Sequence, residues 1–183
     1  AGQIQGFFDM PVDNLFTTPL FARFIKKNIK SKNFICVSPD AGAIERTRAL
    51  ATKINADLAI IDKRRPEPGK SKVMNIIGDV KGKDCIIIDD IIDSGGTIIN
   101  AADALVKKGA RNVYVFITHA VLSGDAIKNI QKSRIKKLVI TDTIDNSKKI
   151  KKANKIQVLS ISQLMAEAIK RISNSTSVSS LFN

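Results

Sequence analysis

Residues 86–97 carry the side chains whose types and spacing best suit chemistry. An apolar run at 86–88 predicts a buried strand, and two adjacent acids, Asp89 and Asp90, follow it. The polar and small residues that then open a predicted helix are Asp93, Ser94, Gly95, Gly96 and Thr97. Small residues let backbone N–H groups approach a phosphate, and a helix N-terminus adds donors and partial positive charge. Because carboxylates repel a phosphate that touches them, we expect Asp89 and Asp90 to bind sugar hydroxyls or to face a Mg²⁺. The pattern therefore predicts a sugar-phosphate site.

A second loop, residues 38–42, lies between a predicted buried strand and a predicted helix. Its acid, Asp40, is followed by Ala41, Gly42 and Ala43. An acid at the edge of a sheet can ligate a hard cation, and the following backbone amides can face a diphosphate. A simpler interpretation is that Asp40 caps the start of the helix. The sequence alone leaves both interpretations open.

A third segment, residues 62–71, breaks the apolar pattern with prolines and basic side chains. Lys63, Arg64 and Arg65 lie at its start, and we predict an exposed loop. Such a loop can simply be solvated. Beside a phosphate site it is instead a candidate lid, because phosphoryl transfer depends on positioned cations more than on a nucleophile.

Composition narrows the class of protein. The chain has 183 residues and a formal net charge of +13, but its basic residues are scattered and tryptophan is absent. We therefore predict a preference for anionic small molecules and no nucleic-acid binding. Cys36 and Cys85 lie in apolar runs, which predicts buried, reduced thiols in a cytoplasmic protein. No secretory signal and no membrane span are predicted. The single histidine, His119, has no evident partner and is predicted to be structural or supporting.

The elements that must position these loops alternate along the chain. Predicted strands cover 34–37, 58–61, 85–88, 113–118, 138–141 and 156–159, with 73–77 as a small flap strand. Predicted helices cover 19–30, 43–54, 97–108, 125–132 and 161–172, the first of them capped by Thr18. This order predicts one α/β domain over residues 1–183, with a mostly parallel sheet and helices on both faces. Ligands bind such sheets beyond the carboxyl ends of the strands, where the three loops meet.

In this order, the three loops resemble those of ribose-phosphate diphosphokinase (phosphoribosyl-pyrophosphate synthetase). The resemblance runs nearly end to end. Further segments that carry it are residues 2–8, 11–14, 73–80, 166–169 and 177–182. It implies a type I phosphoribosyltransferase-like fold. It also implies an enzyme of nucleotide biosynthesis that moves the diphosphoryl group of ATP to the 1-hydroxyl of ribose 5-phosphate, with Mg²⁺, giving 5-phosphoribosyl 1-diphosphate and AMP.

The resemblance also assigns roles to residues. It makes Lys63 and Arg65 the catalytic residues of a mobile loop, and Asp40 a metal ligand. The ribose 5-phosphate set that it implies is Arg65, Asp89, Asp90, Asp93, Ser94, Gly95, Gly96 and Thr97. The diphosphate loop that it implies is Asp40, Ala41, Gly42 and Ala43. Members of this family form hexamers, so a homo-oligomer is expected, with ATP and ribose 5-phosphate as small-molecule partners.

Two departures from the family qualify these expectations. Family members carry a metal-binding His just before the stretch that matches Ala1, and an ATP-gripping domain upstream of it. We therefore expect this chain to be the C-terminal domain with the end of the N-terminal domain, and weak or inactive alone. Ala43 also stands where the family usually has Gly. The alternatives are a non-catalytic regulatory subunit of a synthetase and a salvage phosphoribosyltransferase.

Overall fold

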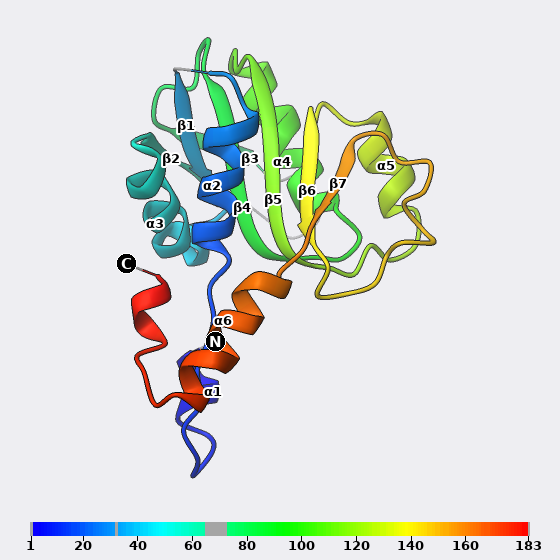
Figure 1. The fold of residues 1–183 in the computed structure, drawn as a ribbon. Coiled ribbons are helices and arrows are strands. Elements are labelled where there is room, and N and C mark those ends of the chain that lie inside the picture. Colours follow the sequence, from blue (N-terminus) through cyan, green and yellow to red (C-terminus); the bar gives the residue numbers. More distant parts are fainter. Residues whose placement is uncertain (1, 32, 65–72, 183) are drawn as a thin grey trace.

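The computed structural model describes residues 2–31, 33–64 and 73–182 and contains one seven-stranded sheet (Figure 1). The strand order is β3-β2-β1-β4-β5-β6-β7. The strands are β1 (Phe34–Ser38), β2 (Asp57–Arg64), β3 (Val73–Ile77), β4 (Asp84–Ile92), β5 (Asn112–Ala120), β6 (Lys137–Thr141) and β7 (Ile156–Leu159). All neighbours pair in parallel except β2 and β3, which are antiparallel. The mostly parallel sheet and the flap strand are therefore confirmed.

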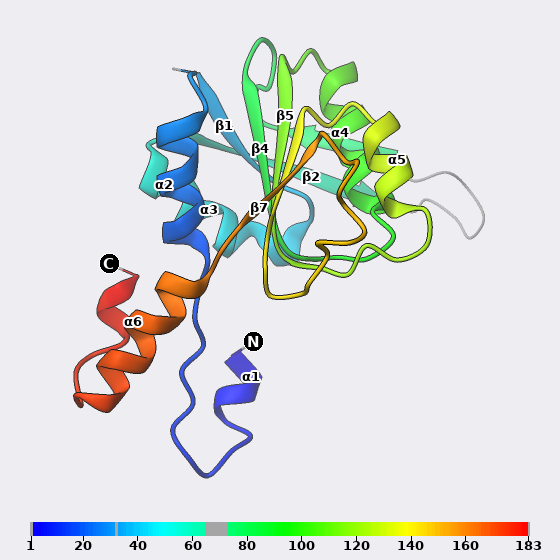
Figure 2. The same cartoon turned by 45° about the vertical axis from the view of Figure 1, so that its right-hand side comes forward.

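Helices cover both faces of the sheet, as predicted. They are α1 (Gly2–Gln5), α2 (Thr18–Asn28), α3 (Ile44–Ile54), α4 (Gly96–Lys107), α5 (Ala126–Lys132) and α6 (Ser162–Ser173), with short 3₁₀ turns at Ala41–Ala43 and Ser179–Leu181. Helices α2 and α3 pack on one face and α4 and α5 on the other (Figures 1 and 2). Parallel strands need crossover connections of about a dozen residues or more, which are long enough to carry a helix over one face of the sheet.

Alternation along the strands explains the two cores. Ile86 and Ile88 of β4 pack with α2 and α3, whereas Cys85 and Ile87 pack with α4 and α5. On the first face Phe116 meets Phe21, with ring centroids 5.3 Å apart. Strands that are buried on both faces need continuous apolar runs, which is the pattern seen in the sequence.

The prediction that both cysteines are buried and free is confirmed. Cys36 and Cys85 are both free and buried. They belong to the cores on opposite faces of the sheet. Burial raises the pKa of each thiol to about 12, so both are protonated and inert near neutral pH.

Some predicted boundaries were wrong, for reasons of strand pairing. Strand β2 continues to Arg64, so residues 62–64 belong to the sheet, because they pair with β3 through Asp62↔Asn75. Strand β4 continues past the acids to Ile92, where it pairs with Ala120. The residue before α2 is Thr17 rather than Thr18. Its hydroxyl bonds to the Thr118 hydroxyl at 2.8 Å instead of capping the helix.

Helices α1 and α6 lie beyond the edge of the sheet where the parallel strands end (Figures 1 and 2). Helix α1 and the 3₁₀ turns were not predicted. Large apolar side chains of these outlying segments are exposed, among them Phe7, Met10, Ile169 and Ile172. Within the described part of the chain, no helix has both the length and the apolar character needed to cross a membrane.

Candidate functional site

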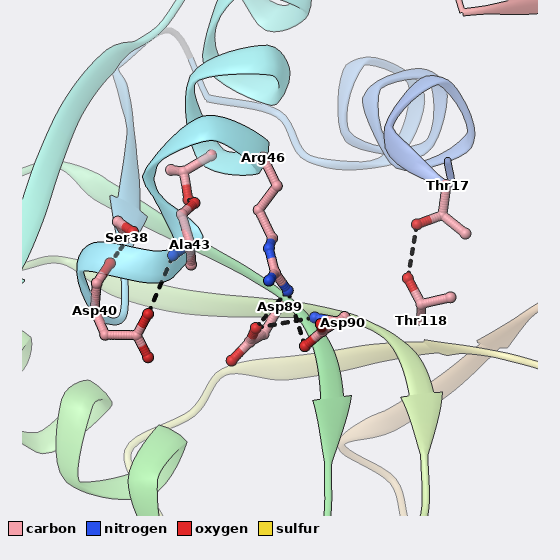
Figure 3. Close-up of polar contacts among 9 residues, drawn as sticks. Thr17, Ser38, Asp40, Ala43, Arg46, Asp89, Asp90 and Thr118 are labelled. Atoms are coloured by element: carbon pink, nitrogen blue, oxygen red, sulfur yellow. Dashed lines mark hydrogen bonds and ion pairs between the residues drawn. The ribbon is translucent and has the colours of Figure 1, made fainter. Parts of the chain in front are cut away.

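The predicted site residues gather where strands β1 and β4 end. The two strands are parallel neighbours, paired through Val37↔Ile87. The loop after β1 therefore lies beside the acidic end of β4. Figure 3 shows Asp40 on the β1 loop and Asp89 and Asp90 on β4, with Arg46 of α3 reaching toward the acids.

Arg46 joins the two acids. Its Nη1 atom lies 2.8 Å from Asp89 Oδ1 and 2.8 Å from Asp90 Oδ1. The backbone N–H of Asp90 also donates to Asp89 Oδ1 at 2.9 Å. The Asp89 side chain is 18% exposed and that of Asp90 is 60% exposed, so Asp90 faces solvent more openly. The pair is thus held by a cation and presented at the surface.

The two carboxylates have different electrostatic environments. Burial is the main cause that raises the pKa of Asp89 to about 6, and the neighbouring Asp90 adds to the rise. Burial also acts to raise the pKa of Asp90, but the hydrogen bond and charge of Arg46 outweigh it and hold that pKa below its usual value. At neutral pH both acids are therefore available as hydrogen-bond acceptors.

The Asp40 loop begins with a cap. Asp40 has an extended backbone, and its Oδ1 accepts a hydrogen bond from the Ala43 N–H at 3.1 Å. The Ser38 hydroxyl donates to the Asp40 carbonyl at 2.6 Å. The capping interpretation is therefore confirmed for this oxygen. Ala41 and Gly42 are exposed, whereas Ala43 is only 1% exposed, so its methyl group packs in the core.

The turn after β4 combines a buried glycine with exposed polar residues. Gly95 adopts a left-handed backbone (φ 79°) immediately before α4 begins at Gly96. A Cβ atom at Gly95 would lie 3.6 Å from Ile92 and 3.7 Å from Ile130. The exposed members of the turn are Asp93, Ser94, Gly96 and Thr97. Because the first N–H groups of a helix have no intrahelical partner, α4 presents donors at this edge.

The structure describes only the first residues of the predicted lid segment. The backbone of Lys63 lies in β2 opposite Met74. Arg65 lies outside the described residues. The roles of Lys63 and Arg65 therefore stay predictions.

The structure adds contacts that the sequence interpretation missed. Arg46 was not predicted, although its position in the first turn of α3 places it beside the Asp40 loop. Thr118, Thr141 and Thr143 form a hydroxyl cluster, in which both Thr141 and Thr143 donate to the Thr118 carbonyl. His119 does have a partner, since its Nδ1 lies 3.1 Å from the Thr143 hydroxyl.

Among the described residues, no group of three or more His, Cys, Asp or Glu side chains is arranged to hold a metal ion. Asp40 contributes a single carboxylate. Mg²⁺ is commonly held by one or two carboxylates together with substrate phosphates and water. One carboxylate, that of Asp40, thus fits a site that the substrate phosphates and water complete.

Comparison with known proteins identifies the family. The sequence profile of the phosphoribosyl synthetase-associated domain matches residues 65–183, more than half of the chain. The chain belongs to this family. A ribose-phosphate pyrophosphokinase of Brucella melitensis is 57% identical over the whole chain, and one of Rhizobium meliloti is 55% identical. In both cases the chain spans 59% of the relative's length.

Solved structures agree with the predicted fold. The phosphoribosylpyrophosphate synthetase of Mycobacterium smegmatis superimposes with a TM-score of 0.85 and 34% identity, over 96% of this chain and 56% of that one. A purine phosphoribosyltransferase of Pyrococcus horikoshii shares only the fold, with a TM-score of 0.50 and 20% identity over 59% of this chain and 73% of that one. The phosphoribosyltransferase-like α/β fold is therefore confirmed.

Proposed function

We propose that this chain supplies the ribose 5-phosphate and diphosphate sites of a ribose-phosphate diphosphokinase. The reaction transfers the diphosphoryl group of ATP to the 1-hydroxyl of ribose 5-phosphate and releases AMP. The observation that carries the proposal is the sequence of features along β4. A cation-held acid pair is followed by a left-handed glycine that opens helix α4. The family membership and the relatives' names agree with it.

Each part of the site has a proposed role in that chemistry. Asp89 and Asp90 accept hydrogen bonds from ribose hydroxyls. The exposed turn ahead of α4 binds the 5-phosphate through backbone N–H groups and the Ser94 and Thr97 hydroxyls. The exposed Ala41 and Gly42 face the diphosphate. Mg²⁺, bound between Asp40 and the substrate phosphates, neutralises phosphate charge.

Lys63 and Arg65 complete the proposal as catalytic cations. Diphosphoryl transfer spreads negative charge over the transferring oxygens, and positioned cations stabilise it. Strand β2 brings Lys63 to the edge where β1 and β4 also end, since β1 and β2 pair through Ser38↔Ile60. Arg65 is the next residue in the sequence after the end of β2 at Arg64. This placement supports a lid role for the segment.

We also propose that the chain works as the C-terminal part of a longer, oligomeric, cytoplasmic synthetase. The relatives extend well beyond the matched region, since the chain spans 59% of their length. Exposed apolar side chains on α1 and α6 leave a surface for further packing. The two free thiols fit a reducing compartment. In this proposal the ATP-gripping residues lie in the rest of the protein.

Two measurements on the chain test the proposal directly, namely calorimetry of ribose 5-phosphate binding and an assay of AMP release. We expect ribose 5-phosphate to bind, and AMP release from ATP and ribose 5-phosphate to be weak. Robust AMP release would show that the chain does not depend on a further ATP-binding part. Base-dependent release of diphosphate from 5-phosphoribosyl 1-diphosphate would instead identify a salvage phosphoribosyltransferase. Absence of any sugar-phosphate binding, together with co-purification with a longer synthetase, would favour the regulatory subunit.

A further inference from the structure

One side-chain nitrogen of Arg46 contacts both members of the acid pair. A single nitrogen, Nη1, lies 2.8 Å from one oxygen of Asp89 and 2.8 Å from one oxygen of Asp90. The two Oδ1 atoms are therefore no more than twice that distance apart. Without a cation between them, two adjacent carboxylates repel each other and turn apart. Arg46 is thus what keeps the two acids close together.

The same contacts leave a defined pattern of acceptors. Arg46 and the Asp90 N–H both contact Oδ1 atoms. Because these contacts hold the Oδ1 atom of each carboxylate, the direction of its Oδ2 atom is fixed as well. Two acceptors on adjacent residues match two hydroxyls on adjacent carbons. Each carboxylate that accepts a hydroxyl hydrogen bond should strengthen binding by about tenfold or more, provided that it is already oriented.

Arg46 is well placed to hold the two acids. It projects from α3 toward the acids (Figure 3). The turn that opens α4 follows the end of β4 along the chain. Its side chain is 33% exposed. Partial burial acts to lower the pKa of Arg46, but the charges of Asp90, Asp89 and Asp40 raise it above its ordinary value, so the cation is permanent.

We propose that Arg46 is a positioning residue that sets Asp89 and Asp90 to accept the 2- and 3-hydroxyls of the sugar, and so selects ribose 5-phosphate over 2-deoxyribose 5-phosphate. The inference rests on the proposed function, which it deepens by naming a determinant of sugar selectivity. It concerns hydroxyl recognition alone. Phosphate recognition remains with the turn ahead of α4.

The test compares two sugars on three variants by calorimetry. Arg46→Ala should weaken ribose 5-phosphate binding by about tenfold or more, because an oriented charged hydrogen bond is lost. Binding of 2-deoxyribose 5-phosphate, which cannot use both acceptors, should fall by less than about threefold. Arg46→Lys should restore part of the selectivity, because one nitrogen makes both contacts. Arg48→Ala is the matched control, since Arg48 is an exposed residue of the same helix and carries the same charge.

The outcomes separate the two proposals. Equal losses for both sugars in Arg46→Ala, with the wild-type chain binding ribose 5-phosphate, would show that Arg46 only supports the fold or the local charge. Unchanged binding in Arg46→Ala, or an equal loss in Arg48→Ala, would likewise overturn the role of Arg46. If the wild-type chain binds neither sugar, the proposed function fails and this inference fails with it. Thermal unfolding of each variant shows that the compared proteins are folded.

Discussion

Gly95 and Gly96 are adjacent, yet the structure predicts opposite effects on stability when each is replaced by Ala. Gly95 has φ 79°, and an added Cβ would make only ordinary contacts, at 3.6 and 3.7 Å, with Ile92 and Ile130. The cost is therefore conformational, about 1–2 kcal/mol for a left-handed backbone. The reduced freedom of the unfolded chain offsets about 0.4–1 kcal/mol of it. We expect Gly95→Ala to lower the free energy of unfolding by about 1 kcal/mol.

Gly96 is the first residue of α4, and an added Cβ would meet nothing within 4 Å. Gly96→Ala should therefore raise the free energy of unfolding by up to about 0.5–1 kcal/mol, the usual gain of Ala over Gly in a helix. The same methyl group would occupy the open space where we place the 5-phosphate. Loss of one backbone hydrogen bond to a charged phosphate should weaken ribose 5-phosphate binding by about tenfold or more.

Urea unfolding and calorimetric titration of both variants check this pair of expectations. A Gly96→Ala chain that is more stable but binds ribose 5-phosphate as well as wild type would refute the placement of the phosphate. A Gly95→Ala chain with increased stability would show that the left-handed backbone is not required there. Each variant serves as the control for the other, because both add the same methyl group to the same turn.

Two further predictions concern carboxylates. Asp84 is buried and accepts hydrogen bonds from Arg111 Nε at 2.9 Å and Asn112 Nδ2 at 2.8 Å. Asp84→Ala should lower the free energy of unfolding by about 2–3 kcal/mol at pH 7. The loss is no larger because water can hydrate the half-exposed Arg111 once its carboxylate partner is removed. Burial acts to raise the pKa of Asp84, but these hydrogen bonds hold it below its usual value, so its contribution should disappear below about pH 4 as the folded carboxylate is protonated. Because Asp89 has a pKa raised to about 6 and must be ionised to accept hydroxyls, ribose 5-phosphate affinity should fall as pH drops through that value.

Controls exist for both carboxylates. Asp57 is an exposed acid that pairs with Lys83 at 3.0 Å near the same end of the sheet as Asp84. Asp57→Ala should change the free energy of unfolding by less than about 1 kcal/mol, so equal effects at the two positions would contradict the burial argument. The phosphate of ribose 5-phosphate also has a second pKa of about 6. Asp89→Asn should therefore make the pH dependence of affinity between pH 5 and 8 shallower without abolishing it, and a dependence as steep as that of the wild type in calorimetric titrations would contradict the assignment.

Much of the fold could be predicted because its strands are buried on both faces. The runs at 34–37, 85–88 and 138–140 are continuously apolar, and they lie within the observed strands β1, β4 and β6. Strand ends were harder, since they depend on partners far away in the chain. Neither the charge at Lys63 nor the acids at Asp89 and Asp90 ends a strand, because β3 and β5 provide the matching hydrogen bonds.

The site could be predicted only where its residues are neighbours in sequence. The acid pair and the glycine turn lie within one short segment, so their chemistry is visible in the sequence. Arg46 is 43 residues from Asp89, and their contact depends on β1 and β4 being adjacent in the sheet. No local pattern distinguishes it from Arg48 on the same helix. The Asp40 cap, in contrast, is a local hydrogen bond and was among the interpretations that the sequence allowed.

The proposed ligand groups derive their order from the core beneath them. Ile88, Ile92 and Ile98 are each at most 3% exposed, and they alternate along the chain with the acid pair and the exposed turn. The hydroxyl acceptors therefore lie on a strand that is paired as far as Ile92, and the phosphate donors begin a helix anchored by Ile98. Such a site needs little rearrangement to bind a sugar phosphate, because its backbone is already fixed by packing.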